Sequence, residues 1–333
     1  MKQINLKTRP VGLPSKDTFE IKDVKLKGMQ SGDVHIQLVY LSVDPYLRGR
    51  MNDTKSYIPP FKLNEPIVST GIGKVVKSKS DDFLEGDFVI GSVPWQEEAI
   101  LPGETLQKID PAVAKLPAYL GIIGMTGLTA YFGLLDIGQP EPDETVVVSA
   151  GAGAVGSAVG QIAQIKGARV VGIAGSEEKI HYMVNELGFD VGINYKTKEF
   201  SHNLAKACPN GIDVYFENVG GKVSDAVWPL LNKFARIPVC GTISSYNKTA
   251  EEDMGPRVQS YLIKSSAKMQ GFTVGDYADQ FAEGKKQLVQ WLEEGKLIHK
   301  ETLVHGFDQT IPAFLSLFDG KNIGKIVVDV RGK

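Results

Sequence analysis

A glycine-rich turn between two β-branched stretches is the feature that most constrains the fold of this chain. Gly151, Gly153 and Gly156 match the spacing G-x-G-x-x-G and closely follow the run Val146–Val148. In this pattern the first glycine permits a tight turn, the second lets backbone approach a diphosphate, and the third lets a helix pack on the strand. Small apolar residues follow, and then a second β-branched stretch at 170–174. This order of strand, turn, helix and strand predicts a Rossmann unit that binds a dinucleotide.

Length and composition limit the other possibilities. The 333 residues suffice for two domains, and 42% hydrophobic and 23% charged residues are typical of a globular protein. The formal net charge of −2 gives no electrostatic reason to expect nucleic acid or a membrane surface as partner. The N-terminal ten residues lack the apolar core of a signal peptide, and no apolar run reaches the roughly 20 residues that span a bilayer. We therefore expect a cytoplasmic protein.

Cysteine and histidine usage argues against a metal centre. Only Cys208 and Cys240 are present, which excludes a disulfide framework and a thiolate cluster. Of the five histidines, only His35 lies in the N-terminal part of the chain. No combination supplies the three protein ligands of a catalytic zinc, so we expect no metal.

Residues 1 to about 120 are predicted to form a β-rich domain of short strands separated by Pro and Gly. Two segments break this pattern. Residues 44–51 contain two arginines and an aromatic residue, and residues 56–61 form a stiff loop that carries Tyr57. On pattern alone, each segment is equally well explained as an ordinary surface loop or as part of a functional site.

From Leu120 onward the pattern changes to alternating helices and strands. A helical, small-residue-rich stretch covers 121–135, and an amphipathic helix covers 280–294. Further strands are predicted at 191–195, 213–218, 235–240 and 268–274, with a last group at 301–307, 311–318 and 325–330 (strand, helix, strand) that could return to the first domain.

Several motifs give the chain a resemblance to a known family. They are Asp44-Pro-Tyr46, 124–131, 150–156, 216–221, 240–246, 269–272 and 320–325. Together they resemble the zinc-independent branch of the medium-chain dehydrogenase/reductase superfamily. This branch contains leukotriene hydroxydehydrogenase/prostaglandin reductase and the plant and bacterial alkenal double-bond reductases, and the resemblance covers nearly the whole chain.

The resemblance implies an α/β fold, with a doubly wound parallel Rossmann sheet and a GroES-like β-rich catalytic domain. The catalytic domain would span 1–123 and 300–333, and the NADP-binding Rossmann domain 124–299. It further implies a homodimer that uses NADPH to reduce the C=C bond of α,β-unsaturated aldehydes and ketones.

Cofactor contacts follow from the resemblance, residue by residue. The 2′-phosphate would be held by Lys179 and Tyr195, although a solvated lysine and a packed tyrosine are the plain alternatives. Ser176 stands 20 residues past Gly156, where NAD-specific sites carry an acid, so its small hydroxyl favours NADPH. The remaining implied contacts are Ala152, Gly153, Ala154, Val155, Met125, Thr126, Asn218, Cys240, Gly241, Thr242, Ile243, Ser244, Ser245, Tyr246, Phe272, Thr273, Val274 and Asn322.

Tyr46 matches a tyrosine that plant members of the branch place in the substrate pocket, and we expect it to be catalytic. Its alternative role is structural packing beside Pro45. We also expect Tyr57 to contact substrate. The family's second pocket tyrosine falls at Lys264 here, and Tyr261 lies three residues earlier on nearly the same helical face. Either Tyr261 substitutes for it, or the pocket lacks that hydroxyl.

Two other functions are compatible with the same motifs. One is a quinone reductase on the same scaffold, and the other is an NADPH-binding regulatory protein with negligible turnover. The glycine motif predicts cofactor binding in all three cases, so it does not distinguish among them.

Overall fold

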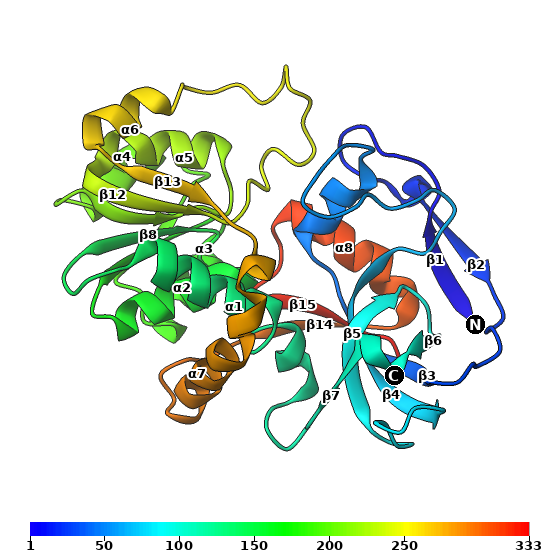
Figure 1. The fold of residues 1–333 in the computed structure, drawn as a ribbon. Helices are drawn as coiled ribbons and strands as arrows, with labels where there is room; N and C mark the ends of the chain where they lie inside the picture. Colours follow the sequence, from blue (N-terminus) through cyan, green and yellow to red (C-terminus); the bar gives the residue numbers. More distant parts are fainter. Residues whose placement is uncertain (333) are drawn as a thin grey trace. The chain divides into compact units, whose positions relative to one another are not determined.

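The chain divides into two units in the computed structural model, which describes residues 1–332 (Figure 1). The first unit comprises residues 1–120 and 301–322, and the chain from Ile326 onward. The Rossmann unit comprises residues 121–300 and 323–325. We expected boundaries at 123 and 300. The short segment 323–325 was expected in the catalytic domain but belongs to the Rossmann unit. The last residue of the expected returning segment 300–333 lies outside the described residues.

The Rossmann unit is built on a six-stranded sheet in the order β10-β9-β8-β11-β12-β13, and its strand pairs are parallel. Its strands are β8 (Thr145–Ser149), β9 (Arg169–Ala174), β10 (Val191–Asn194), β11 (Ile212–Phe216), β12 (Leu231–Val239) and β13 (Lys268–Gly271). Its helices are α1 (Met125–Phe132), η5 (Gly133–Gly138), α2 (Ala154–Ile165), α3 (Glu177–His181), η6 (Tyr182–Glu186), α4 (Phe200–Ala207), α5 (Gly221–Val227), η7 (Trp228–Leu230), α6 (Gln259–Ser265), η8 (Val274–Gln280) and α7 (Phe281–Glu293). The predicted doubly wound α/β fold is confirmed.

Small residues on α2 explain how this helix lies close to the sheet. A Cβ on Gly160 would come within 2.0 Å of the Phe189 ring, so only glycine fits there. All five residues of β8 are buried, as a central parallel strand requires. On the other face, apolar residues of α4, α5 and α6 pack into one core with the sheet, for example Leu204, Val227 and Leu262. Helices therefore cover both faces (Figure 1).

The strand order reverses between β8 and β11, which are neighbours in the sheet although two strands separate them in sequence. Ligands of open parallel sheets bind outside the carboxyl ends of the strands at such a switch point. Ser149 ends β8, and Glu217 and Asn218 directly follow β11. These residues therefore mark the edge where the candidate site should lie.

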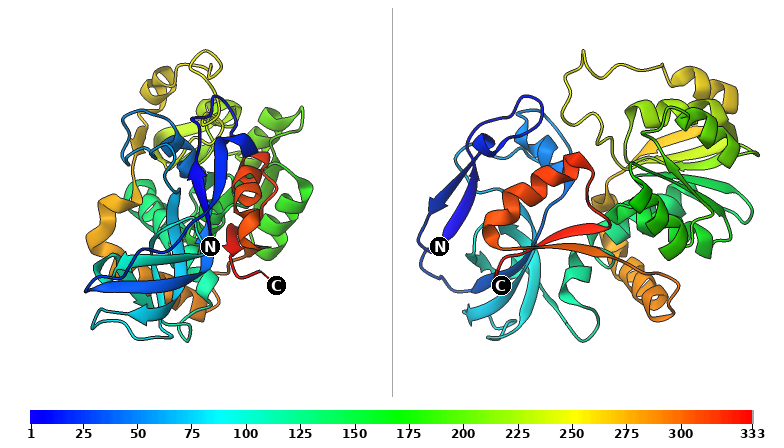
Figure 2. Two further views of the ribbon diagram at one scale, coloured as in Figure 1. Left: turned by 90° about the vertical axis from the view of Figure 1, so that its right-hand side faces the viewer. Right: turned by 180° about the vertical axis from the view of Figure 1, so that it is seen from behind.

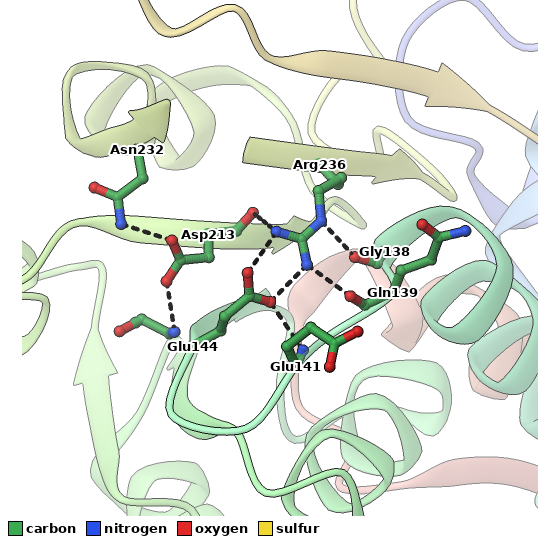
Figure 3. A network of polar contacts seen from close by, with 8 residues as sticks. Gly138, Gln139, Glu141, Glu144, Asp213, Asn232 and Arg236 are labelled. Carbon is green, nitrogen blue, oxygen red and sulfur yellow. Dashed lines mark hydrogen bonds and ion pairs between the residues drawn. The ribbon is translucent and has the colours of Figure 1, made fainter. Parts of the chain in front are cut away.

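At the amino ends of the strands, Arg236 of β12 joins three segments (Figure 3). Its guanidinium donates to both carboxylate oxygens of Glu144, at 2.8 and 2.5 Å, and to the carbonyls of Gly138 and Gln139 at 2.9 and 2.6 Å. Glu144 directly precedes β8. The network therefore fixes the loop that leads into the central strand.

The first unit contains a seven-stranded sheet in the order β14-β15-β3-β4-β5-β7, with β6 paired to β3, and a separate β1-β2 pair. Its strands are β1 (Lys2–Leu6), β2 (Phe19–Asp23), β3 (Asp33–Ser42), β4 (Val68–Ser78), β5 (Phe88–Pro94), β6 (Glu98–Pro102), β7 (Leu106–Ile109), β14 (Glu301–His305) and β15 (Lys325–Asp329). Its helices are η1 (Lys16–Thr18), η2 (Pro45–Met51), η3 (Gly103–Thr105), η4 (Leu116–Leu120), η9 (Phe307–Gln309) and α8 (Thr310–Asp319). The predicted β-rich domain is confirmed.

The core of the first unit centres on Trp95, which is fully buried and donates from its indole N–H to Ser69 Oγ at 2.8 Å. Phe19 of β2 stacks on its ring, and Phe314 of α8 meets it edge-on, with centroids 6.5 and 6.0 Å away. Figure 2 shows α8 beside the strands of this unit. The C-terminal helix is thus part of the same core as the N-terminal strands.

Three local predictions differ from the structure. The segment 44–51 forms the 3₁₀ helix η2 instead of a loop. Strand β12 begins at Leu231 rather than 235, and includes Phe234 in a left-handed conformation (φ 66°), where its pairing shifts register. Strand β13 ends at Gly271, because Thr273 caps the following turn together with Asp276. No helix among residues 1–332 is long and apolar enough to cross a membrane.

Candidate cofactor and active site

The glycine-rich turn after β8 begins with a residue that is not glycine. Ala150 takes the left-handed conformation (φ 51°), so the positive φ of the turn falls on Ala150 and not on Gly151. Gly151 permits the turn by leaving space, because a Cβ there would lie 2.6 Å from Met183 Sδ and 3.2 Å from the Gly172 Cα. The first glycine thus lets the turn pack against its own unit.

The second and third glycines behave as their spacing predicts. A Cβ on Gly156 would lie 2.3 Å from the Ala150 carbonyl oxygen, so this glycine lets α2 pack against the turn. Gly153 caps α2 without a side-chain hydrogen bond, and a Cβ there would approach only Ala150. Ala154 and Val155 begin α2, so their N–H groups lie at the positive end of a helix dipole, which suits a diphosphate.

A segment from the end of the chain pairs with this turn. The Gly324 N–H donates to the Ala152 carbonyl at 2.8 Å, and Gly153 and Gly324 form a parallel bridge. Gly324 has a φ of 65°, and a Cβ there would lie 1.9 Å from the Lys300 carbonyl oxygen. This pairing explains why 323–325 belong to the Rossmann unit. Asn322, a predicted cofactor contact, directly precedes it.

Two lysines and a tyrosine gather after β9 and β10. Lys179 is half-buried on α3, and burial first, then the charge of Lys196, lower the pKa of its ammonium group. The Lys196 Nζ lies 5.9 Å from the centre of the Tyr195 ring. Neither lysine forms an ion pair with any residue that the structure describes. The Ser176 hydroxyl accepts from the Lys179 backbone N–H at 3.4 Å, as the N-cap of α3.

The positive charge of Lys179 and Lys196, which forms no ion pair and which Glu178 opposes only in part, would fit the 2′-phosphate of NADPH, because like charges are unfavourable near one another without an anion. Lys179 and Tyr195 were predicted contacts, but Lys196 was not. A signal was available in the sequence, since Lys196 directly follows Tyr195 at the end of a predicted strand.

Two buried hydroxyls also fit a polar ligand. Thr126 Oγ1 on α1 and Ser244 Oγ after β12 are buried, and neither has a hydrogen-bond partner among the described residues. Leaving such groups unpaired costs about 1–3 kcal/mol each. Both residues are predicted cofactor contacts, so the donor set of the Rossmann unit fits a cofactor with many polar atoms.

Glu217 organises the carboxyl edge of β11. This carboxylate is buried and accepts from the backbone N–H groups of Val219 and Gly220 at 2.8 and 2.9 Å. The hydroxyl groups that donate to it belong to Ser149, Tyr215 and Ser224. Glu217 was not among the predicted site residues, although it lies in the motif 216–221 at the end of a predicted strand.

Asn218 is held by the same edge. Its backbone N–H donates to Ser149 Oγ and its side-chain amide donates to the Ser149 carbonyl, both at 2.8 Å. The amide is therefore fixed at the switch point of the sheet, where the predicted cofactor contact needs it.

The predicted contacts after β12 and β13 differ in their surroundings. Residues 240–246 form a half-buried loop, and Cys240 N–H donates to the Glu217 carbonyl at 2.9 Å. Burial, then the Glu217 charge, raises the pKa of the Cys240 thiol to about 12, so it stays protonated. The Phe272 ring packs edge-on against Phe216, with centroids 6.3 Å apart. Phe272 is thus engaged in packing within its own unit, and Thr273 and Val274 begin the turn that follows.

In the first unit, Tyr46 lies on η2, half-buried against the hydrophobic core. Burial is the main cause that raises the pKa of its phenol, the negative charge of Asp44 adds to it, and Arg50 opposes both. The hydroxyl therefore stays protonated at neutral pH. Tyr57, the other predicted substrate contact, is 70% exposed in the loop that follows.

Tyr261 and Lys264 both lie on α6. Tyr261 packs, partly buried, against the apolar core of the Rossmann unit, and its hydroxyl makes no hydrogen bond with a described residue. Lys264 is exposed. Within residues 1–332, no group of three His, Cys, Asp or Glu side chains could hold a metal ion.

Comparison with known proteins covers the whole chain. The model of the N-terminal domain of oxidoreductases matches residues 2–109, and that of zinc-binding dehydrogenases matches residues 154–294. The provisionally named NADP-dependent oxidoreductase YfmJ of Bacillus subtilis is 56% identical over 98% of this chain and 97% of its own length. The NADP-dependent 2-alkenal reductase of Nicotiana tabacum is 42% identical, over 99% and 97%.

The chain belongs to the zinc-independent medium-chain dehydrogenase/reductases, in their prostaglandin and alkenal reductase branch. This medium-chain reductase also matches a solved structure throughout. The structure of CurA from Vibrio vulnificus in complex with NADPH is 45% identical, with a TM-score of 0.94 and complete coverage of both chains. The predicted family is thus confirmed, and the chain is an oxidoreductase of this branch.

Proposed function

We propose that this chain reduces the C=C bond of α,β-unsaturated aldehydes and ketones with NADPH. One hydride is added to the β-carbon and one proton to the α-carbon, so that enone, NADPH and a proton give a saturated carbonyl compound and NADP⁺. The names of its relatives support this reaction class, since the Nicotiana tabacum protein is a 2-alkenal reductase and bovine prostaglandin reductase 1 is 40% identical over 98% of both chains.

The cofactor is NADPH, as predicted. The CurA structure contains NADPH, and YfmJ is named as NADP-dependent. When bound, NADPH supplies the hydride. The glycine-rich turn at Gly153 would hold the diphosphate of this cofactor. Lys179 and Lys196, with Tyr195 beside them, would hold the 2′-phosphate. The unpaired hydroxyls of Thr126 and Ser244 would bind further polar atoms of the cofactor.

The observation that carries the proposed donor is the position of Tyr46 on η2, half-buried against the hydrophobic core. During hydride addition, negative charge develops on the carbonyl oxygen of the substrate as an enolate, and a hydrogen-bond donor stabilises it. A tyrosine whose pKa is raised by burial and by Asp44 keeps its proton at neutral pH, so it can donate without being charged. Tyr57 is proposed as a substrate contact in the loop after η2.

A direct test supplies NADPH with a 2-alkenal, an enone and a quinone, and identifies each product by mass. We expect stoichiometric NADPH oxidation with formation of the saturated aldehyde and ketone. Turnover of the quinone alone, with a semiquinone seen by stopped-flow, would make the chain a quinone reductase. Tight NADPH binding without oxidation by any of the three would indicate a regulatory role.

The homodimer and the cytoplasmic location are further parts of the proposal. The edge strand β13 has an exposed Met269, and Phe234 on the neighbouring β12 is 66% exposed, so this edge of the Rossmann sheet could pair with a second copy. Light scattering coupled to size exclusion would measure twice the 36.2 kDa chain mass if the protein is a dimer.

A further inference from the structure

Arg50 lies on η2 with Tyr46, and its guanidinium is held in one orientation. The group lies over the Phe61 ring, with 3.9 Å from Cζ to the ring centre. Its Nε donates to the Pro59 carbonyl at 3.1 Å, and its Nη1 donates to the Val68 carbonyl at 3.3 Å. A stacked guanidinium with two carbonyl partners has little freedom to move away.

The charge of Arg50 has no counter-ion among the residues that the structure describes. Although Arg50 is half-buried, no carboxylate of residues 1–332 forms an ion pair with it, and its Nη2 makes no hydrogen bond with a described residue. Arg48, on the same helix, shows by contrast how an arginine with a purely structural role is bound. It is buried and its terminal nitrogens donate to Asn52 Oδ1 and to two backbone carbonyls.

Arg50 also lies within electrostatic range of two proposed substrate contacts. Its charge interacts with the phenols of Tyr46 and Tyr57, and burial lowers the pKa of the guanidinium without discharging it. Asp44 is the acidic group on the other side of Tyr46, but it is buried and accepts a hydrogen bond from the Ser42 hydroxyl. The positive charge of Arg50 thus lies on the same helix as Tyr46, without a carboxylate partner among residues 1–332 and with its Nη2 unused.

We propose that Arg50 binds a carboxylate carried by the substrate, so that the enzyme prefers acidic enones over neutral ones of the same shape. The inference rests on the proposed enone reduction. A guanidinium that keeps an unused edge of N–H donors matches a carboxylate in charge and geometry, and such a bond strengthens where water is partly excluded. Arg50 would thus set substrate preference, while Tyr46 serves the reacting carbonyl.

The test compares straight-chain 2-enals that end in a carboxylate with their methyl esters, at several chain lengths. At the best length we expect the wild type to reduce the acid with a kcat/KM roughly 10- to 100-fold above that of the ester, as expected for a hydrogen bond between charged groups. Arg50→Gln should bring this acid-to-ester ratio close to one, and Arg50→Lys should retain part of it. The ratio should also fall with added salt.

Lys55→Gln is the matched control, because Lys55 is an exposed cation in the loop after η2, and it should keep the wild-type ratio. A ratio near one in the wild type at every length, or one that survives in Arg50→Gln, would overturn the inference. If Arg50→Gln does not fold, the reduced ratio of Arg50→Lys decides. If neither acid nor ester is turned over, the proposed reaction is wrong. Calorimetric binding of the saturated acid to the NADP⁺-loaded wild type and Arg50→Lys then decides the role of Arg50 separately.

Discussion

At the scale of single residues, Lys196 adds most to the predicted cofactor site. If Lys179 and Lys196 both contact the 2′-phosphate, Lys179→Ala and Lys196→Ala should each raise the Kd for NADPH roughly 10- to 100-fold, because a hydrogen bond to a charged group contributes about 1.5–3 kcal/mol. Binding of NADH, which lacks that phosphate, should hardly change. Fluorescence titration with both cofactors measures this, and Lys198→Ala, an exposed lysine nearby, serves as control.

The same site predicts a pH dependence. Burial and the neighbouring Lys196 charge lower the pKa of Lys179 from its ordinary 10.5. The ammonium attracts a phosphate only while protonated, so NADPH affinity should be complete at neutral pH and decline as the pH rises through this lowered pKa. Equal declines for NADPH and NADH, or equal kcat/KM for the two cofactors, would contradict the assignment.

Tyr46 is the second residue whose role can be measured directly. A positioned proton donor contributes typically 10²–10⁴-fold, and a second donor in the pocket would reduce the effect of losing one. We expect Tyr46→Phe to lower kcat by about tenfold or more with unchanged NADPH affinity. Tyr261→Phe should lower it less, because Tyr261 packs against the Rossmann core.

Steady-state kinetics with an alkenal distinguishes these variants. A change confined to KM would mean that Tyr46 only orients the substrate. Full kcat in Tyr46→Phe together with a loss in Tyr261→Phe or Lys264→Ala would move the donor to α6.

At the scale of elements, Glu217 joins the ends of β8 and β11 to the start of α5. Glu217→Ala should lower the free energy of unfolding by about 3–5 kcal/mol, because its buried donors lose their common acceptor. Glu217→Gln keeps the shape and one acceptor oxygen, so a smaller loss of about 1–2 kcal/mol is expected. Urea unfolding measures both, with Glu178→Gln as the exposed control; equal effects of the three changes would show that Glu217 is not an organising residue.

The Arg236 network at the other ends of the strands predicts how stability depends on pH. Burial opposes ionisation of Glu144, but the Arg236 hydrogen bonds and charge outweigh it and hold the pKa of this carboxyl below 4.5. Its contribution is therefore present above pH 4.5 and is lost as the pH falls through the lower folded pKa. Arg236→Met should lower the free energy of unfolding by about 2–3 kcal/mol at neutral pH. It should also reduce the dependence of this free energy on pH in the acidic range. Unfolding curves at several pH values measure this. An unchanged pH dependence in Arg236→Met would contradict the prediction.

At the scale of the whole molecule, the zinc-independent branch predicts activity without a metal. We expect this medium-chain reductase to polarise the carbonyl by hydrogen bonds rather than by a Lewis acid. Alkenal reduction should therefore survive exhaustive chelation, and elemental analysis should find no stoichiometric zinc. One tightly bound zinc whose removal abolishes turnover would refute this prediction.

The order of the elements along the chain could be read from the sequence, because local patterns encode it. Three such patterns each span only a few residues: the glycine spacing, the β-branched run Val146–Val148, and the change near Leu120 from short strands to alternating helices and strands. They were enough to predict a doubly wound sheet, a β-rich first domain and the place of the diphosphate. Family motifs then pointed to NADPH and to Tyr46.

What only the tertiary structure decided depends on residues that are distant in sequence. The carboxyl ends of β8 and β11 are adjacent only after the parallel sheet has formed, so the hydrogen bond from Ser149 to Glu217, across 68 residues, leaves no local signal. The same holds for the unpaired hydroxyls of Thr126 and Ser244, which show their need for a partner only once they are buried. Arg48 and Arg50 lie two residues apart and look alike in the sequence. Arg48 is buried with three acceptors and is therefore structural, whereas Arg50 is only half-buried and keeps an unused Nη2, on which the proposed substrate preference rests.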